Sequence, residues 1–180
     1  MKHIVTYNIF ESNISESNRY LNSGDKIIFL DIDGVLRPIN SYIGKDEYGQ
    51  LFTEDCIQAL RYLLTMTGAY IVISSTWKAS GLLIMKEIWD KRNLPGEVID
   101  ITPNEVDVVD SGAAEFYDLV DRGLEIEQWI KNNNFSGRYV IIDDITDFTE
   151  EQTKHYVKTD TNVGLTMDNV KQAINILKQS

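Results

Sequence analysis

Short runs of consecutive apolar residues, separated by stretches with helical spacing, dominate the chain. Five of these runs predict strands, at residues 26–31, 69–74, 97–101, 139–143 and 155–158. A strand covered on both faces is apolar throughout rather than alternating, so the runs indicate a buried, mostly parallel sheet. The segment at residues 3–10 is a further candidate strand.

Apolar residues three and four positions apart predict four helices between and after these strands. The expected inward faces are Ile57, Leu60, Leu63 and Leu64; Leu83, Ile84, Ile88 and Trp89; Leu124, Ile126, Trp129 and Ile130; and Val170, Ala173, Ile174 and Leu177. Thr53, Ser80 and Thr166 are the expected N-caps. Alternating strands and helices indicate an α/β fold with a mostly parallel central sheet and helices on both faces. We assign this domain to residues 25–180 and an N-terminal extension to residues 1–24.

Composition and charge exclude several classes of protein. The 180 residues suit one domain, and 43% hydrophobic with 25% charged residues is ordinary for a globular protein. The formal net charge of −11 argues against a basic protein that coats nucleic acid or membranes. A single cysteine, Cys56, excludes an intrachain disulfide and a cysteine zinc site. No signal-peptide core or membrane-length apolar run is present, so we expect a cytoplasmic protein without membrane contact.

Polar side chains that could take part in catalysis or bind a metal follow three of the predicted strands. The first strand ends in Asp31 and Asp33, the second in Ser74, and the fourth in Asp143 and Asp144. Ligands of open α/β sheets bind beyond the carboxyl ends of the strands, so these side chains are expected to form one site. Carboxylates so close together repel one another unless some are protonated or a cation is bound. Oxygen ligands without a thiol favour a hard ion, with Mg²⁺ first.

These motifs resemble those of the haloacid dehalogenase (HAD) superfamily of phosphatases. The resemblance covers residues 26–148: an apolar strand ending Asp31-Ile-Asp33-Gly34, a strand ending in Ser74, a basic residue near a helix start at Arg122, and the acidic pair 143–144. A closer resemblance is to the small HAD domain of Swiss Army Knife RNA-repair proteins. It rests on Ser74-Ser75-Thr76-Trp77-Lys78, Thr102-Pro103, Arg122-Gly123-Leu124-Glu125-Ile126 with Trp129-Ile130, Ile142-Asp143-Asp144 and Gly164-Leu165-Thr166.

The resemblance implies a single Rossmann-like HAD domain with a minimal cap or none, and a role for each motif residue. Asp31 is the expected nucleophile, which forms an aspartyl-phosphate, and Asp33 the expected general acid and base. Ser74 would hold a phosphoryl oxygen and Arg122 would offset its charge. The expected Mg²⁺ ligands are Asp31, the main-chain carbonyl of Asp33, Asp143 and Asp144.

Two assignments stay open at this stage. Ser75 can take the place of Ser74, and Lys78 competes with Arg122 as the cation beside the phosphoryl group. Lys78 can instead reach a remote phosphate of the substrate. We expect Ser75, Lys78 and Gly34 to contact the substrate. Trp77 is expected to pack in the core or the loop.

The expected substrate is a phosphate monoester, and the resemblance points to an RNA or DNA end or a nucleotide. Residues 37–50 are too few for a cap domain and predict only a hairpin flap, which leaves the site open. Residues 104–121 carry six acidic and no basic side chains. Beside the mouth of the site they would repel polyanions and favour small esters.

A different class of function is the main alternative. In it the protein is a catalytically inactive HAD-like binding protein whose acidic surface engages a basic protein partner. The complete motif set argues against this alternative, and no feature of the sequence indicates an obligate protein partner. A phosphoacceptor receiver domain is disfavoured because receivers carry the acidic pair on the first strand and the accepting Asp on the third, whereas Asp31-Ile-Asp33 comes first here.

Overall fold

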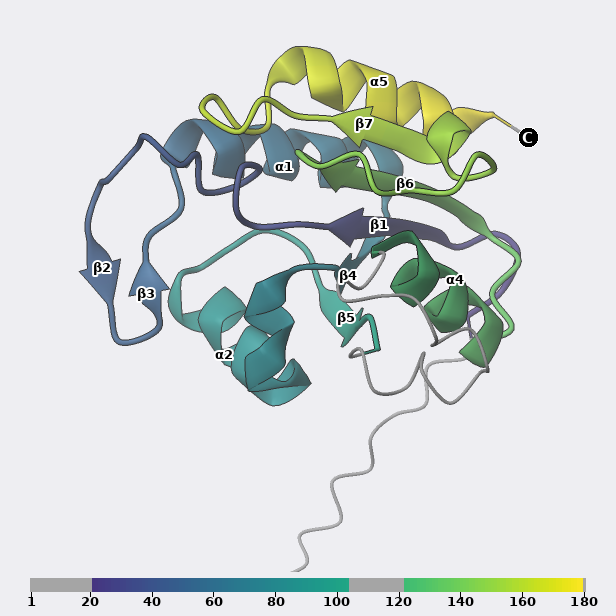
Figure 1. Ribbon diagram of the computed structural model, residues 1–180, viewed down its shortest axis with the longest axis horizontal. Coiled ribbons are helices and arrows are strands. Elements are labelled where there is room, and N and C mark those ends of the chain that lie inside the picture. The colour runs from purple at the N-terminus through teal and green to yellow at the C-terminus, as the bar shows by residue number, and fades with distance from the viewer. Residues whose placement is uncertain (1–20, 104–121, 180) are drawn as a thin grey trace, which may run out of the picture.

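A five-stranded sheet runs through the centre of the protein in the computed structural model, which describes residues 21–103 and 122–179 (Figure 1). The strands are β1 (Lys26–Leu30), β4 (Tyr70–Ile73), β5 (Val98–Ile101), β6 (Arg138–Asp143) and β7 (Tyr156–Lys158). They are parallel and lie in the order β5-β4-β1-β6-β7. All five strands predicted from apolar runs are confirmed. The candidate strand at residues 3–10 lies outside the described residues, and the boundary between an extension at 1–24 and a domain at 25–180 stays a prediction.

Helices cover both faces of the sheet, as the sequence predicts. They are α1 (Glu54–Thr67), α2 (Leu82–Lys91), α4 (Arg122–Asn132) and α5 (Met167–Lys178). Ile28 and Leu30 of β1 pack in one core with α1, α2 and α5, and Ile27 and Phe29 pack in a second core with α4 (Figure 1). Since each strand buries both sides, its apolar run has no polar alternation. Among the described residues, no helix is long and apolar enough to cross a bilayer.

The helix starts agree only partly with the expected caps. Thr166 caps α5 with a complete capping box. Thr53 precedes α1, but its hydroxyl makes no capping hydrogen bond. Ser80 is not the cap of α2, because Gly81 takes a left-handed φ of 86° and the helix starts only after it. Leu83 is consequently 70% exposed rather than directed into the core.

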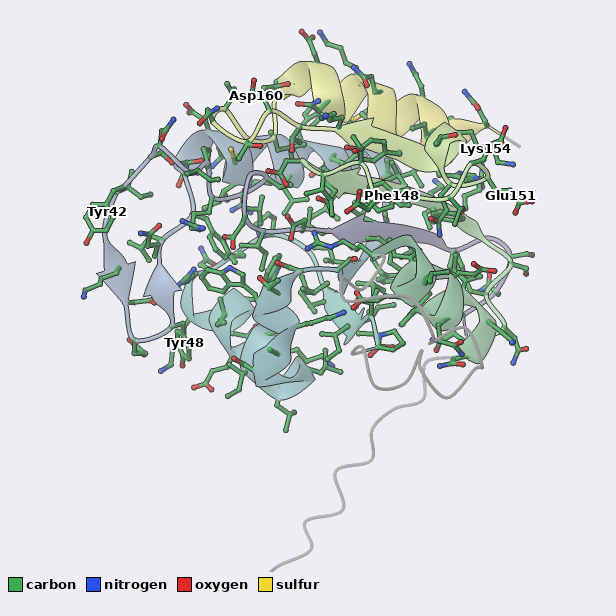
Figure 2. The ribbon with its side chains drawn as sticks, viewed as in Figure 1. Tyr42, Tyr48, Phe148, Glu151, Lys154 and Asp160 are labelled. Atoms are coloured by element: carbon green, nitrogen blue, oxygen red, sulfur yellow. The ribbon has the colours of Figure 1, made fainter. Side chains whose placement is uncertain are left out.

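The expected hairpin flap lies between β1 and α1. It consists of the antiparallel strands β2 (Lys45–Asp46) and β3 (Gly49–Gln50). Tyr42 and Tyr48 lie on this segment, away from the centre of the sheet (Figure 2). No larger insertion occurs within residues 21–103 or 122–179, so the described part of the chain has the minimal cap that the sequence predicts.

The chain reverses direction across the sheet between β1 and β6. It passes from β1 to β4 and β5 on one side, and then returns to β6 and β7 on the other. Ligands of such sheets bind where the strand order reverses. The carboxyl ends of β1 and β6, with Asp31 and Asp143, mark that position.

Candidate active site

Main-chain hydrogen bonds fix the residues at the carboxyl ends of the three central strands. The amide of Asp31 donates to the carbonyl of Ile142 at 3.0 Å, and the amide of Ser74 donates to that of Leu30 at 2.9 Å. These bonds extend the sheet ladder one residue beyond β1 and β4. The side chains of Asp31, Ser74 and Asp143 therefore start from the rigid edge of the sheet rather than from a loop.

Three carboxylates come together at this edge. Asp31 is 3% exposed, Asp143 is fully buried and Asp144 is partly buried. One oxygen from each lies within 4.8 Å of the others. The pKa of Asp31 is raised to about 7, first by burial and then by the nearby charge of Asp143, while Arg122 opposes both. Burial likewise raises the pKa of Asp143 to about 6, against the lowering effect of Arg122.

Arg122 reaches two of these carboxylates from the first residue of α4. Its Nη1 atom lies 3.0 Å from Oδ1 of Asp31 and 2.6 Å from Oδ2 of Asp143. A cation at a helix start opposes the helix dipole, and the two buried carboxylates offset that cost. Of the two cations that the sequence leaves open, Arg122 is thus the one that contacts Asp31.

The carboxylate cluster suits a hard divalent cation. Three carboxylates facing one guanidinium leave uncompensated negative charge when all are ionised. Asp144 is held by a 2.6 Å hydrogen bond from the Thr161 hydroxyl. It lies against Gly34, where a side chain would collide with its carboxylate. An all-oxygen set of this kind is typical of Mg²⁺ sites.

The side chain of Asp33 is not part of this carboxylate cluster. Its Oδ1 atom accepts a hydrogen bond of 2.5 Å from Nε of Arg37 and one of 3.1 Å from Nε1 of Trp77. The side chain of Asp33 is 36% exposed, so its carboxylate is accessible to solvent. Sequence reasoning missed both donors. The spacing of Asp33 and Arg37, four residues apart with opposite charges, was the available signal for one of them.

Two serine hydroxyls lie buried beside the acids. Neither Ser74 nor Ser75 has a well-formed hydrogen-bond partner for its Oγ atom among the described residues. The Ser75 hydroxyl is close enough to Asp31 to lower the pKa of that carboxyl slightly, against the larger effect of burial. Buried hydroxyls without partners are rare, and a ligand oxygen would satisfy them.

Lys78 and Gly34, both expected to contact the substrate, have other contacts in the structure. The Nζ atom of Lys78 donates to Thr102 Oγ1 at 2.9 Å, to the carbonyl of Pro103 at 2.7 Å and to the buried carboxylate of Glu125. Gly34 makes room for Asp144. Their contacts with a substrate stay predictions.

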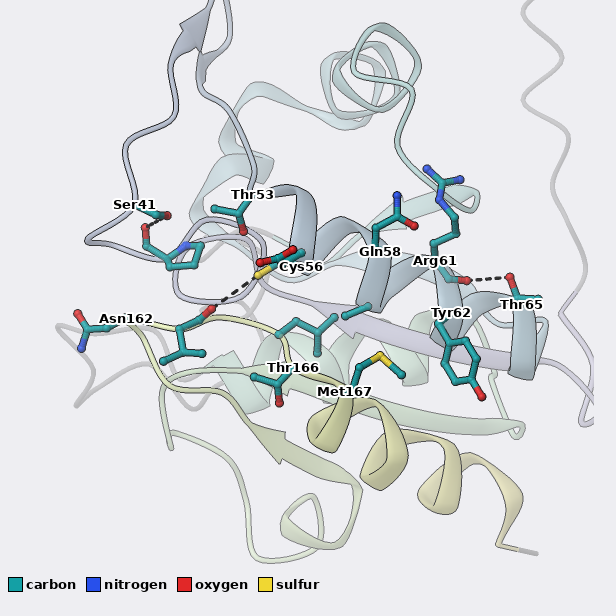
Figure 3. Close-up of a pocket in the computed structure, with 15 residues that line it drawn as sticks. Ser41, Thr53, Cys56, Gln58, Arg61, Tyr62, Thr65, Asn162, Thr166 and Met167 are labelled. Atoms are coloured by element: carbon teal, nitrogen blue, oxygen red, sulfur yellow. Dashed lines mark hydrogen bonds between the residues drawn. The ribbon is translucent and has the colours of Figure 1, made fainter.

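A separate pocket opens between α1 and the start of α5 (Figure 3). It has a volume of about 900 Å³, and its lining includes Cys56, Tyr62, Thr166 and Met167. The described carboxylates of the site are not among its lining residues. This pocket therefore lies apart from the candidate active site.

Comparison with known proteins identifies the family. A family model of the HAD domain in Swiss Army Knife RNA repair proteins matches residues 27–170. The chain belongs to this HAD family. The match spans the acids at the ends of β1 and β6, the serines after β4 and Arg122, and membership supports a hydrolase of the HAD superfamily.

Two further comparisons add little to this HAD assignment. A solved structure from Legionella pneumophila, assigned to the HAD superfamily (subfamily III A) hydrolases, is 12% identical with a TM-score of 0.39. The alignment covers 90% of this chain and 88% of that one. A search of curated proteins finds no similar sequence.

Proposed function

We propose that this HAD protein is a phosphohydrolase that cleaves phosphate monoesters through an aspartyl-phosphate on Asp31. One observation carries the proposal: the Asp31 carboxylate lies buried at the switch point of the sheet, in contact with Arg122. Beside it lie the buried hydroxyls of Ser74 and Ser75, for which the described part of the chain offers no well-formed hydrogen-bond partner. Phosphoryl transfer needs a nucleophile, a cation and hydrogen-bond donors for the phosphoryl oxygens. The residues of this edge supply all three.

The proposed reaction has two steps. In the first, a carboxylate oxygen of Asp31 attacks phosphorus, the bond to the leaving oxygen breaks, and Asp33 gives that oxygen its proton. In the second, a water oxygen attacks the same phosphorus while Asp33 takes a proton from the water, and the bond to Asp31 breaks. The products are an alcohol and inorganic phosphate. Arg122 offsets the negative charge of the phosphoryl group throughout.

The proposed cofactor is Mg²⁺, held by Asp31, Asp143 and Asp144, with the main-chain carbonyl of Asp33 as the further ligand that the family resemblance implies. When bound, the ion would neutralise charge on the phosphoryl group and on Asp31. Its support is the cluster of carboxylate oxygens within 4.8 Å and the raised pKa of Asp31, due first to burial.

The proposed substrate is the phosphorylated end of an RNA or DNA strand, or a nucleotide. The support is the family itself, whose description names RNA repair, together with the small size of the flap, which leaves room for a bulky substrate. The net charge of −11 weighs against a long polyanion. The acidic stretch at 104–121 lies outside the described residues.

Phosphate release from a panel of substrates tests this function. The panel contains nucleotides, sugar phosphates and oligonucleotides with 5′- or 3′-phosphates, each with Mg²⁺ and with EDTA. Asp31→Asn is the test variant, and Asp90→Asn, which changes an exposed acid on α2, is the matched control. We expect turnover by wild type and by the control with Mg²⁺ only, and loss of several powers of ten in Asp31→Asn.

Other results would redirect the assignment. Undiminished turnover in EDTA would contradict the metal site. Absence of turnover on the whole panel, with specific retention of a basic protein partner, would favour the inactive binding protein. A phosphoenzyme that forms in wild type and is absent from Asp31→Asn would separate covalent catalysis from direct attack by water.

A further inference from the structure

Both side-chain hydrogen bonds that Asp33 makes with the described residues fall on one of its two carboxylate oxygens. Nε of Arg37 and Nε1 of Trp77 both donate to Oδ1, at 2.5 and 3.1 Å. Among the described residues, Oδ2 accepts no hydrogen bond. Two donors on one oxygen restrict the orientation of the carboxyl group, so that Oδ2 is the oxygen available to a substrate.

We propose that Trp77 and Arg37 are positioning residues, which hold the carboxyl of Asp33 so that Oδ2 faces the leaving oxygen of the substrate. The inference rests on the proposed function, in which Asp33 donates and then accepts a proton. It goes beyond that function because it assigns a positioning role to Arg37 and Trp77, neither of which the family resemblance gives a role, and to the segments that support them.

Arg37 is placed by the tight loop that follows β1. The amide of Gly34 donates to the carbonyl of Arg37 at 2.9 Å, and the amide of Arg37 donates to that of Ile32 at 2.9 Å. This fold brings the Arg37 side chain back to Asp33. Its Nη1 atom donates at 2.5 Å to the side-chain oxygen of Gln50 in the flap. One guanidinium thus joins the Asp33 carboxylate to β3.

Trp77 comes from a different segment than Arg37. It lies in the short 3₁₀ helix η1 (Thr76–Ser80), which follows β4. Its ring packs edge-on against Phe52, with centroids 5.4 Å apart. The guanidinium of Arg92 stacks over both rings, 4.6 Å from Phe52 and 5.5 Å from Trp77. The indole is therefore locked in place, with its N–H directed at Asp33.

Arg92 also links the flap to the rings of Phe52 and Trp77. Its Nε and Nη2 atoms form a two-pronged ion pair with Asp46 of β2, at 2.9 and 2.7 Å, and Nη1 donates to the carbonyl of Gln50 at 3.1 Å. The Arg92 side chain is only 6% exposed. The flap thus supports both donors to Asp33, Arg37 through Gln50 and Trp77 through Arg92.

A purely structural role for Trp77 and a role in proton transfer make different predictions. A leaving group of low pKa departs without a proton, whereas an alkoxide departs only when a general acid protonates it. Loss of the orientation of Asp33 should therefore slow phosphoryl transfer to Asp31, measured as kcat/KM, far more for an alkyl phosphate than for 4-nitrophenyl phosphate. Loss of fold or of metal binding should slow both equally.

Trp77→Phe tests the inference, because it keeps a ring against Phe52 and Arg92 but removes the donor to Asp33. Trp89→Phe is the matched control: Trp89 lies in the same core, 6.4 Å from Phe52 between ring centroids, and its indole donates to the Pro95 carbonyl instead. With Mg²⁺ we expect Trp77→Phe to lower kcat/KM, which reports the transfer of the phosphoryl group to Asp31, about 10-fold for the alkyl phosphate and less than about 2-fold for the aryl phosphate. Trp89→Phe should leave the ratio of the two rates at the wild-type value.

Arg37→Met and Arg37→Lys provide an independent arm. Arg37→Met should change the ratio of the two rates in the same direction as Trp77→Phe, and Arg37→Lys should restore part of it because a donor is regained. An unchanged ratio in Trp77→Phe and Arg37→Met, whether the rates fall together or not at all, would overturn the inference while leaving the phosphatase function intact. Absence of turnover by wild type on both esters would contradict the proposed function and the proton-transfer role of Asp33 with it.

Discussion

Nη1 of Arg122 lies 3.0 Å from Oδ1 of Asp31, although 91 positions separate the two residues along the chain. The contact forms because α4 starts at the carboxyl edge of the sheet, where β1 also ends. It gives the proposed nucleophile a cation without using the full capacity of the guanidinium, which has five N–H donors. Such a cation stabilises negative charge on both the carboxylate and a phosphoryl group.

Replacing Arg122 should weaken catalysis strongly. We expect Arg122→Ala to lower kcat/KM by about 100- to 1000-fold, a loss typical for the removal of one preorganised donor at the reacting group. Arg122→Lys should recover only part of it, since an ammonium cannot reproduce the planar fork. Steady-state kinetics with Mg²⁺ measure the effect, and Arg61→Ala, an exposed change on α1, is the control. Equal activity of Arg122→Ala and the control would remove Arg122 from the site.

Lys78 and Glu125 form a buried ion pair that holds η1 against α4. Their side chains are 8% and 9% exposed. Lys78→Met alone should lower the free energy of unfolding by about 3–5 kcal/mol, because it leaves the buried Glu125 carboxylate without a cation and, among the described residues, with only the Thr102 hydroxyl as a hydrogen-bond donor. The double variant Lys78→Met with Glu125→Leu should regain most of that stability, because no charge then stays buried. Chemical denaturation measures both variants.

The same double variant tests the predicted contact between Lys78 and substrate. A KM equal to that of wild type would show that Lys78 serves only the ion pair with Glu125. A KM raised about tenfold, in a protein of restored stability, would show that its ammonium also binds a substrate phosphate.

The fold and the grouping of the acids could be predicted from the sequence because both depend on local patterns. Unbroken apolar runs identify buried parallel strands, and the carboxyl ends of neighbouring strands must meet. The strand order places β4, β1 and β6 side by side, and this brings together Asp31, Ser74 and Asp143. That Arg122 contacts Asp31 while Lys78 pairs with Glu125 could not be predicted, because the choice depends on how α4 packs against η1.

The donors to Asp33 show a second limit of the sequence. The hydrogen bond from Trp77 to Asp33 spans 44 positions. It requires β4 to pair with β1, so that η1, which follows β4, lies beside the loop that follows β1. A tryptophan after a strand suits core packing equally well, and Trp89 and Trp129 do lie in the cores. Similarly, the start of α2 was predicted too early, since the left-handed backbone of Gly81 cannot be read from composition.

Gly34 should be needed for the metal site rather than for the fold alone. Its φ is 73°, and a Cβ at this position would collide with the carboxylate of Asp144. Gly34→Ala should displace Asp144 and lower Mg²⁺ affinity by about 10- to 100-fold, as loss of ligand positioning typically does. Gly68→Ala is the matched control, with a similar φ of 63° and nothing within 4 Å of its Cβ. Calorimetric titration with Mg²⁺ compares the two, and equal affinities would separate Asp144 from the metal site.

Asp31→Asn should stabilise the metal-free protein at neutral and alkaline pH. Burial raises the pKa of Asp31 from 3.8 to about 7, so between these values the folded state binds more protons than the unfolded state. The contribution of Asp31 to the free energy of unfolding of wild type is therefore fully present below about pH 4, and it is lost as the pH rises from there through about 7. An uncharged amide has no such loss. In EDTA at about pH 8, Asp31→Asn should unfold with a free energy ~1–3 kcal/mol above wild type, and the difference should shrink toward about pH 5.

Added Mg²⁺ should reverse the order of stability at about pH 8. The ion binds the folded state, so its stabilisation of wild type grows with the logarithm of its affinity, and Asp31→Asn loses one of the charged ligands. Denaturation curves for both proteins at two pH values, with EDTA and with Mg²⁺, measure this crossover, and Asp90→Asn again controls for loss of an acid outside the site. A stability difference that stays constant with pH would mean that Asp31 titrates normally in the folded protein. A response to Mg²⁺ that is the same in both proteins would exclude Asp31 from the metal ligands, even if it remained the nucleophile.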